Sequence, residues 1–322
     1  MSSAKSVPAG VPVKLAAAHT ESRMITPLQR VIRRFRRHKG AMFGLVLLLL
    51  VMTYIIGGSI AYSEADANFN NTSIRLSPPS LEHPFGTDRV GRDILARTVY
   101  GGQISLLIGL LAVVVSVTLG TTVGALSGYY GGMIDSVLMR FTEAMLSIPS
   151  LLLLLVMAKF FGGRVGDVQL LGRTLSGSVI VIVIIIGLTS WMALARIVRS
   201  TVLSLKEEEF ITAARALGAP NHHIILRHIL PNATASIIVA ATLGIAGAIL
   251  AEAYISFLGL GVQAPTASWG NMLTEAQEFQ IIANAPWYWF FPGLLILMTV
   301  LSINYVGDGL RDALDPRSDK KV

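Results

Sequence analysis

Charged residues are scarce in this sequence. Asp, Glu, Lys and Arg make up only 14% of its 322 residues, whereas 53% are hydrophobic, and the mean hydropathy is +0.63. Soluble domains carry about 25% charged residues because their surfaces face water. The uncharged residues of this chain form long blocks, which is typical of a protein that crosses a lipid bilayer several times.

Two further absences narrow the chemistry. The sequence has no cysteine, which excludes disulfide bonds, Cys-ligated zinc and thiol catalysis. It also has no Gly-x-x-x-x-Gly-Lys-Ser/Thr loop to cradle ATP phosphates, so we expect neither an enzyme nor a bound cofactor or metal in this chain. The net charge is +7, but Lys and Arg flank the apolar blocks. That distribution indicates membrane topology, and we expect no nucleic-acid partner.

Six apolar blocks are long enough to cross a bilayer, which takes about 20 helical residues. They cover residues 41–62, 104–126, 133–161, 176–197, 232–251 and 287–306. The third block contains Glu143 and Lys159, which we expect near opposite membrane interfaces; a proton-relay role for Glu143 is the alternative. Pro149 is expected to kink this helix.

The distribution of Lys and Arg predicts the orientation. Nine of them precede the first block and four follow the last, whereas residues 253–286 contain none. The positive-inside rule therefore puts both termini and the 200–228 loop in the cytoplasm. The basic run 33–39 serves as a topology anchor, with binding of anionic lipid as the alternative. The aromatic run 287–290 is interpreted as an interfacial belt, with a ligand cage as the alternative.

These boundaries divide the chain into five parts. They are a cytoplasmic basic tail that is partly disordered (1–38), a first transmembrane helix (39–62), an external loop (63–102), a core of five transmembrane helices (103–308) and a cytoplasmic C-terminal tail (309–322).

Small residues recur every four positions at Gly120, Gly124 and Gly128, and again around Gly244. This spacing lets two helices approach closely within lipid. The contact is made either inside this chain or with a partner subunit, and the spacing does not decide between them.

The 200–228 loop contains a short predicted helix over 207–217. Ser204 and Glu207 form a capping-box pattern, and Gly218 followed by Pro220 predicts the stop. Phe210, Ala214 and Leu217 would lie on one apolar face. A helix this short is not stable alone, so we expect it to dock on a partner; lying flat on the membrane is the alternative.

The loop resembles the coupling loop of ABC importer permeases. The family pattern is Glu-Ala-Ala, three residues, Gly, then a hydrophobic-Pro pair, and here Thr212-Ala213-Ala214, Gly218 and Leu230-Pro231 stand in its place. Thr212 departs from the pattern, which has Glu. The positions that the resemblance implies for ATPase coupling are Glu207, Glu208, Phe210, Ile211, Thr212, Ala213, Ala214, Leu217 and Gly218.

Five other motifs are similar to the C-type permeases of oligopeptide, dipeptide and nickel ABC importers. They occupy residues 86–93, 127–135, 256–261, 268–270 and 307–316. The resemblance implies an all-α, polytopic type I importer fold in a prokaryotic plasma (inner) membrane. It also implies a second homologous permease, two cytoplasmic ATPase subunits that carry ATP and Mg, and an extracytoplasmic solute-binding protein. Peptides are the expected cargo, with a nickel complex or an oligosaccharide as alternatives.

The long connection over 253–286 is a second candidate site. Its glycines predict a broken or re-entrant segment followed by a short helix. We expect Trp269, Asn271 and Gln277 to form part of an outer gate or of the surface that receives the binding protein; a passive loop is the alternative.

Two other classes of protein fit less well. A secondary transporter should show repeats and mid-bilayer carboxylates, and the sequence offers only Glu143. A membrane-embedded enzyme needs a convergent catalytic set, but His222, His223 and His228 have no spaced acidic partner.

Overall fold

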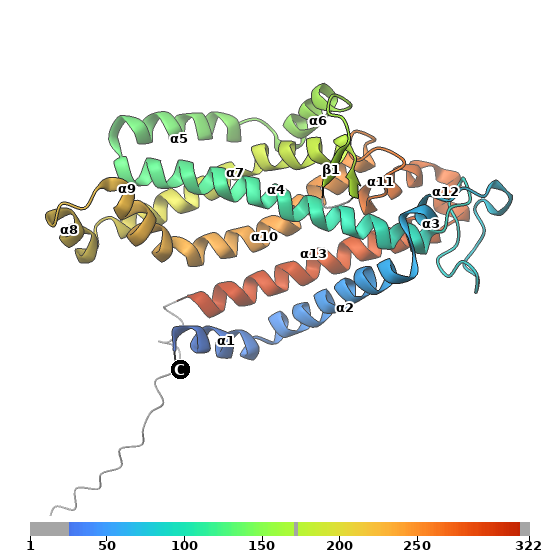
Figure 1. Cartoon of the computed structure of the whole chain (residues 1–322), viewed down its shortest axis with the longest axis horizontal. Helices are drawn as coiled ribbons and strands as arrows, with labels where there is room; N and C mark the ends of the chain where they lie inside the picture. The colour runs from blue at the N-terminus through green and yellow to red at the C-terminus, as the bar shows by residue number, and fades with distance from the viewer. Residues whose placement is uncertain (1–25, 171–172, 316–322) are drawn as a thin grey trace, which may run out of the picture.

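The computed structural model of the chain describes residues 26–170 and 173–315. Within these residues, five helices are long and apolar enough to cross a membrane, and they form an elongated bundle (Figure 1). They are α2 (Lys39–Ala61), α4 (Ile94–Tyr130), α7 (Gly177–Leu205), the rod Asn221–Phe257 and α13 (Trp287–Leu314). The rod joins α9 (Asn221–Ile224), the π-helical turn η2 (Ile225–Ile229) and α10 (Leu230–Phe257).

Shorter elements connect these helices. They are α1 (Pro27–Arg37), α3 (Glu64–Asn68), η1 (Thr72–Ile74), α5 (Gly132–Leu146), α6 (Ser150–Phe161), α8 (Glu209–Ala216), α11 (Trp269–Met272), η3 (Thr274–Gln277) and α12 (Phe279–Asn284). Parts of the two predicted tails, residues 1–25 and 316–322, lie outside the described residues.

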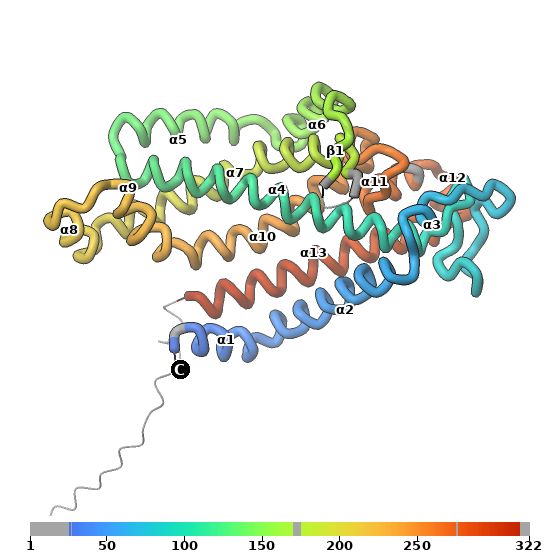
Figure 2. The backbone as a smooth tube through the Cα atoms, in the orientation of Figure 1, coloured from blue at the N-terminus to red at the C-terminus, as the bar shows by residue number. Residues whose placement is uncertain are grey.

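The third predicted span is not one kinked helix. It consists of α5 and α6, whose axes differ by 86° across the break, and the tube in Figure 2 shows the turn between them. Pro149 is the N-cap of α6, and a proline disfavours helical backbone at the residue before it, which ends α5 early. A sixth crossing exists only if this bent pair is counted as one span. Glu143 and Lys159 are both exposed within the chain.

The loop between the third and fourth predicted blocks contains a small antiparallel strand pair within an otherwise helical fold. Strands β1 (Val168–Leu170) and β2 (Arg173–Leu175) pair with Val168 opposite Leu175.

The core lies where α4, α7 and α10 meet. The most extensive helix contact in the described chain joins α4 to α7, and the largest apolar cluster combines residues of α4, α6, α7 and α10, including Ile108, Ile182 and Ile186. Helices α2 and α13 pack together along the other side of α10 and α4 (Figure 1).

The bundle has two distinct ends. At the α8 end lie α8, α9, α1 and the C-terminal end of α13; at the α11 end lie α3, α11 and α12 (Figure 1). The basic run 33–39 is divided at His38, whose Nδ1 accepts a hydrogen bond from the amide of Ala41 and caps α2. The aromatic run 287–290 starts α13 at the α11 end, where Tyr288 is buried and Phe290 is exposed.

Candidate functional site

Helix α8 stands at one end of the bundle between α7 and α9. Helix α7 continues to Leu205, so Ser204 lies inside its last turn and the predicted capping box is wrong. The N-cap of α8 is Glu208, without a side-chain hydrogen bond. Gly218 has a φ of +77°, the left-handed conformation that glycine adopts readily. The predicted C-terminal end of this helix is therefore correct, whereas its predicted start is not.

The apolar residues of α8 divide between two faces. Ile211 is fully buried and packs with Tyr129, Val202 and Ile224, and Ala214 packs against the same cluster. Phe210 is 43% exposed and Leu217 is 88% exposed. The single stripe of Phe210, Ala214 and Leu217 was thus wrong, because Ala214 faces the bundle.

Phe210 and Leu217 leave an apolar face of α8 open. Thr212, Ala213, Glu207 and Glu208 are also exposed around it. Full burial of Ile211 stabilises the attachment of α8 to the bundle by roughly 1.5–3 kcal/mol. The helix is therefore held firmly on one side and presented on the other.

The end of α4 also holds this loop. The Tyr129 hydroxyl donates to Oδ1 of Asn221 at 2.8 Å, and the guanidinium of Arg215 lies 5.3 Å from the centre of the Tyr129 ring. Sequence reasoning missed Tyr129, Arg215 and Asn221 as a set, because they are separated along the chain and only the fold brings them together. Helix α8 is thereby linked to α4 as well as to α7 and α9.

A second polar contact ties three helices together near the same end. Arg199 of α7 donates two hydrogen bonds to the carboxylate of Asp135 in α5, from Nε and Nη2, both at 2.6 Å. The hydroxyl of Ser127 in α4 donates to the same carboxylate. A guanidinium that donates two parallel hydrogen bonds to one carboxylate makes a stronger ion pair than a single contact does. Ser127 and Asp135, the two ends of the 127–135 motif, thus meet at this ion pair.

The three glycines of α4 face α7 within the chain. A Cβ at Gly120, Gly124 or Gly128 would lie 2.5–2.9 Å from a backbone oxygen of α7. A Cβ at Gly244 of α10 would lie 3.4 Å from Val113 of α4, an ordinary contact distance. The α4 glycines thus serve a contact inside this chain.

The 253–286 connection folds back onto the bundle at the α11 end. Trp269 is fully buried and its Nε1 donates to the carbonyl of Thr98 at 2.8 Å, so it cannot touch a docking protein directly, contrary to that part of the prediction. Asn271 is partly buried and donates to the carbonyls of Val262 and Thr266. Gln277 is exposed.

Two glycines allow the backbone of this connection to pack closely. A Cβ at Gly261 would lie 2.0 Å from the Ser256 hydroxyl, and one at Gly270 would lie 2.7 Å from Cα of Ala253. The motifs 256–261 and 268–270 thus meet in one tightly packed unit.

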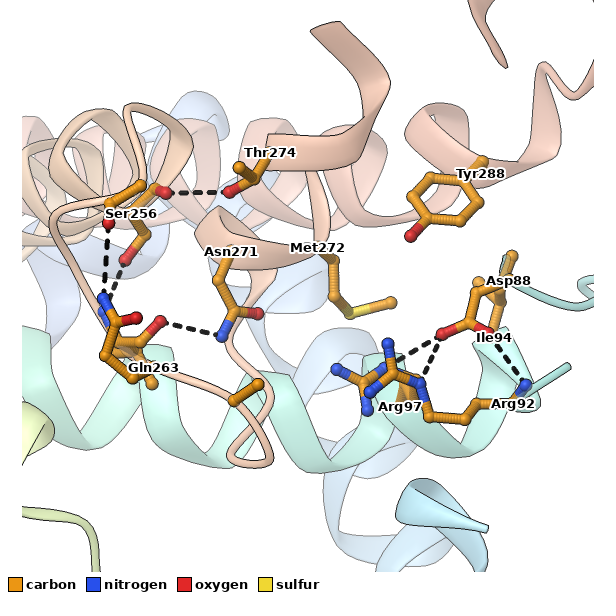
Figure 3. Close-up of a pocket in the computed structure, with 13 residues that line it drawn as sticks. Asp88, Arg92, Ile94, Arg97, Ser256, Gln263, Asn271, Met272, Thr274 and Tyr288 are labelled. Atoms are coloured by element: carbon orange, nitrogen blue, oxygen red, sulfur yellow. Dashed lines mark hydrogen bonds and ion pairs between the residues drawn. The ribbon is translucent and has the colours of Figure 1, made fainter. Parts of the chain in front are cut away.

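A cavity of about 180 Å³ opens beside this unit. Figure 3 shows Asp88, Arg92 and Arg97 gathered on one side and Gln263 and Asn271 on another. Nε of Arg92 donates to Oδ2 of Asp88 at 2.5 Å. Charged side chains of the 86–93 motif therefore border the same site.

Glu252 is the main residue that the sequence reasoning overlooked. Its carboxylate is fully buried in α10 and accepts hydrogen bonds from the hydroxyls of Ser105 (3.0 Å), Ser256 (2.7 Å) and Ser268 (2.7 Å). The predicted fifth block stopped at residue 251, so Glu252 was left out of the predicted spans, and Glu143 was named as the single candidate for a carboxylate in the bilayer. A block extended by one turn to the SFLGLG motif would have included it.

Comparison with known proteins identifies the family. Residues 120–320 match the family described as binding-protein-dependent transport system inner membrane component, and residues 26–79 match the N-terminal TM domain of oligopeptide transport permease C. The chain belongs to the binding-protein-dependent inner-membrane permeases.

Two named relatives are similar in sequence to this permease over most of its length. It is 43% identical over 293 residues to a dipeptide transport system permease protein of Alkalihalophilus pseudofirmus, covering 91% of each chain. It is 40% identical over 290 residues to an oligopeptide transport system permease protein of Haemophilus influenzae, covering 88% of this chain and 87% of the relative.

A solved structure shares the fold of this permease. The inward-facing MetNI methionine ABC transporter aligns with 69% of this chain and 98% of its own chain, with a TM-score of 0.53 and 21% identity. At this identity the likeness shows the fold alone.

Proposed function

We propose that this permease forms half of the translocation path of an ATP-driven peptide importer and that α8 receives the motion of a cytoplasmic ATPase. The observation that carries the proposal is the open apolar surface formed by Phe210 and Leu217, on a helix that the buried Ile211 holds against the bundle. A surface helix with two large exposed apolar side chains is typical of a docking element.

The cargo follows from the relatives. Those named above are dipeptide and oligopeptide permeases, and they match nearly the whole chain. Peptides are therefore the proposed solute of this permease.

The α8 end is proposed to face the cytoplasm. It contains α1 with its arginines, and the positive-inside rule puts such a cluster on the cytoplasmic side. The α11 end then faces outward, where an extracytoplasmic solute-binding protein delivers peptide. A second homologous permease completes the path, and two ATPase subunits supply ATP and Mg.

The coupling mechanism uses α8 as a lever. ATP closes the ATPase pair, and the docked α8 moves with it. Helix α8 is held by α7, by α9 and by Tyr129 of α4. Its motion therefore passes into α7, into α4 and, through α9, into α10. The permease pair then turns from inward- to outward-facing, which requires that ATP bind the two states with different affinity.

The test replaces Phe210 and Leu217 together by alanine. Truncating a central apolar contact of a protein interface typically costs about 2 kcal/mol, so the affinity of the reconstituted permease pair for its ATPases should fall roughly thirtyfold. Peptide uptake into proteoliposomes should fall with it. Leu28→Ala in α1 is the control, since Leu28 is 69% exposed at the same end but lies outside α8.

Unchanged ATPase affinity in the double variant would refute the docking role. Uptake of peptide by the permease with no ATPase subunit present would refute the importer itself. Labelling of residues 207–218 from outside the cell would refute the orientation.

A further inference from the structure

The Glu252 carboxylate is the centre of a two-layer hydrogen-bond network. Its three serine donors come from α4 (Ser105), from α10 (Ser256) and from the N-cap of α11 (Ser268). Each hydroxyl also accepts a hydrogen bond from a backbone amide of the 253–286 connection. The three pairs are Trp269 to Ser105, Val262 to Ser256 and Asn271 to Ser268, each at 3.1 Å.

A backbone amide N–H can only donate, so each serine oxygen accepts from its amide and leaves the hydroxyl proton available for Glu252. A serine hydroxyl has one proton, and here it goes to Glu252 while the oxygen accepts from an amide. Three amides therefore act through three hydroxyls on one carboxylate. Moving the connection away from the bundle would leave these buried groups without partners, which is strongly unfavourable.

The connection and the nearby ends of α4 and α10 consequently move as one body. Thr274 adds a bond to the carbonyl of Ser256 at 2.8 Å, and Gln277 bonds the carbonyl of Phe257. Helix α4 has 37 residues, or about 55 Å at 1.5 Å per residue, and reaches from this unit to Tyr129 beside α8. Helix α10 reaches the same loop through η2 and α9.

We infer that Glu252 is a positioning residue that transmits the docking of the solute-binding protein, on the 253–286 connection, through α4 and α10 to α8. This inference rests on the proposed function. It gives the 256–261 and 268–270 motifs a common role, because both build the body that Glu252 holds.

The experiment measures ATP hydrolysis by the full reconstituted complex with and without peptide-loaded binding protein. In Glu252→Ala the stimulation by the binding protein should fall about fivefold or more, the lower range of coupling between two sites, while the basal rate is retained. Ser302→Ala is the control, since this buried serine donates only within α13, to the carbonyl of Thr299.

Conservative variants make the test sharper. Ser256 and Ser268 both donate to Oε1 of Glu252, whereas Ser105 donates to Oε2. In Glu252→Gln, Oε1 still accepts from Ser256 and Ser268, but the Nε2 that replaces Oε2 cannot accept the proton of the Ser105 hydroxyl. Glu252→Gln and Ser105→Ala should therefore both show an intermediate stimulation. The double variant should be no worse than Ser105→Ala alone, because both single changes remove the same donation from Ser105 to the side chain at position 252.

The outcomes separate the two proposals. Wild-type stimulation in Glu252→Gln and Ser105→Ala, or additive losses in the double variant, would overturn the role of Glu252. An equal fall of basal and stimulated rates would also overturn it, because it would indicate a merely structural role. If the complex with Glu252→Ala does not assemble, the stimulation measured in Glu252→Gln and Ser105→Ala still tests the role of Glu252. A wild-type complex that ignores the binding protein would instead overturn the proposed function.

Discussion

The contact between α4 and α7 can be tested by adding one methyl group. In Gly124→Ala the new Cβ would lie 2.5 Å from the carbonyl oxygen of Ala195 and 2.8 Å from Cβ of Val198. Neither atom can rotate away, because one is backbone and the other is fixed to it, so the helices must separate. Overpacking of this kind costs about 1–3 kcal/mol.

A second glycine provides the matched control. Gly247 of α10 has no heavy atom within 4 Å of its ideal Cβ position, and alanine is intrinsically the better helix former by up to about 1 kcal/mol. Gly247→Ala should therefore be neutral or slightly stabilising.

The assay is thermal unfolding of the purified full-length chain in detergent, followed by tryptophan fluorescence. Since 1 kcal/mol shifts the Tm by about 2–4 °C in chains of about 150–250 residues, Gly124→Ala should lower the Tm of this longer chain by about 2–12 °C at most. If Gly124→Ala and Gly247→Ala unfolded at the same temperature, the close packing of α4 on α7 would be refuted.

Two further predictions concern the ends of the bundle. Gly218→Val forces a branched side chain into a left-handed backbone position (φ +77°), which costs roughly 1–2 kcal/mol. It should reduce peptide uptake while membrane insertion persists, and Gly218→Asn should be tolerated better. Equal uptake by the Val and Asn variants would count against the left-handed turn. At the other end, the Arg89 guanidinium lowers the pKa of Glu278 below its usual value of 4.5. A depressed folded pKa means that this ion pair stabilises the loop at neutral pH and is lost as pH falls through the folded pKa. Proteolysis of the 82–90 loop should therefore rise in the wild type as the pH falls through the lowered pKa of Glu278, but show no such rise in Arg89→Gln. A wild type without this rise would contradict the pairing.

Local patterns predicted much of the architecture. Five of the six apolar blocks correspond to helices of membrane length, because a run of apolar residues has to be helical to satisfy its backbone in lipid. Gly218 ended α8 as predicted, since a left-handed stop needs a residue without a Cβ. Pro149 was correctly predicted to disturb the third block, but the size of the bend was not predicted. A proline indicates where a helix is interrupted and not where the next helix packs, and here α6 packs on α7 at 86° to α5.

The sequence by itself determined which segments are long and apolar enough to cross a membrane, where along the chain the basic residues lie and which motifs belong together in one family. The tertiary structure alone decided that Ile211 is buried while Phe210 is open, that the α4 glycines face α7 and that Glu252 gathers serines from α4, α10 and the start of α11. The reason is physical: in a membrane protein both the lipid-facing and the protein-facing residues are apolar, so hydropathy identifies a span but not the neighbour against which it packs.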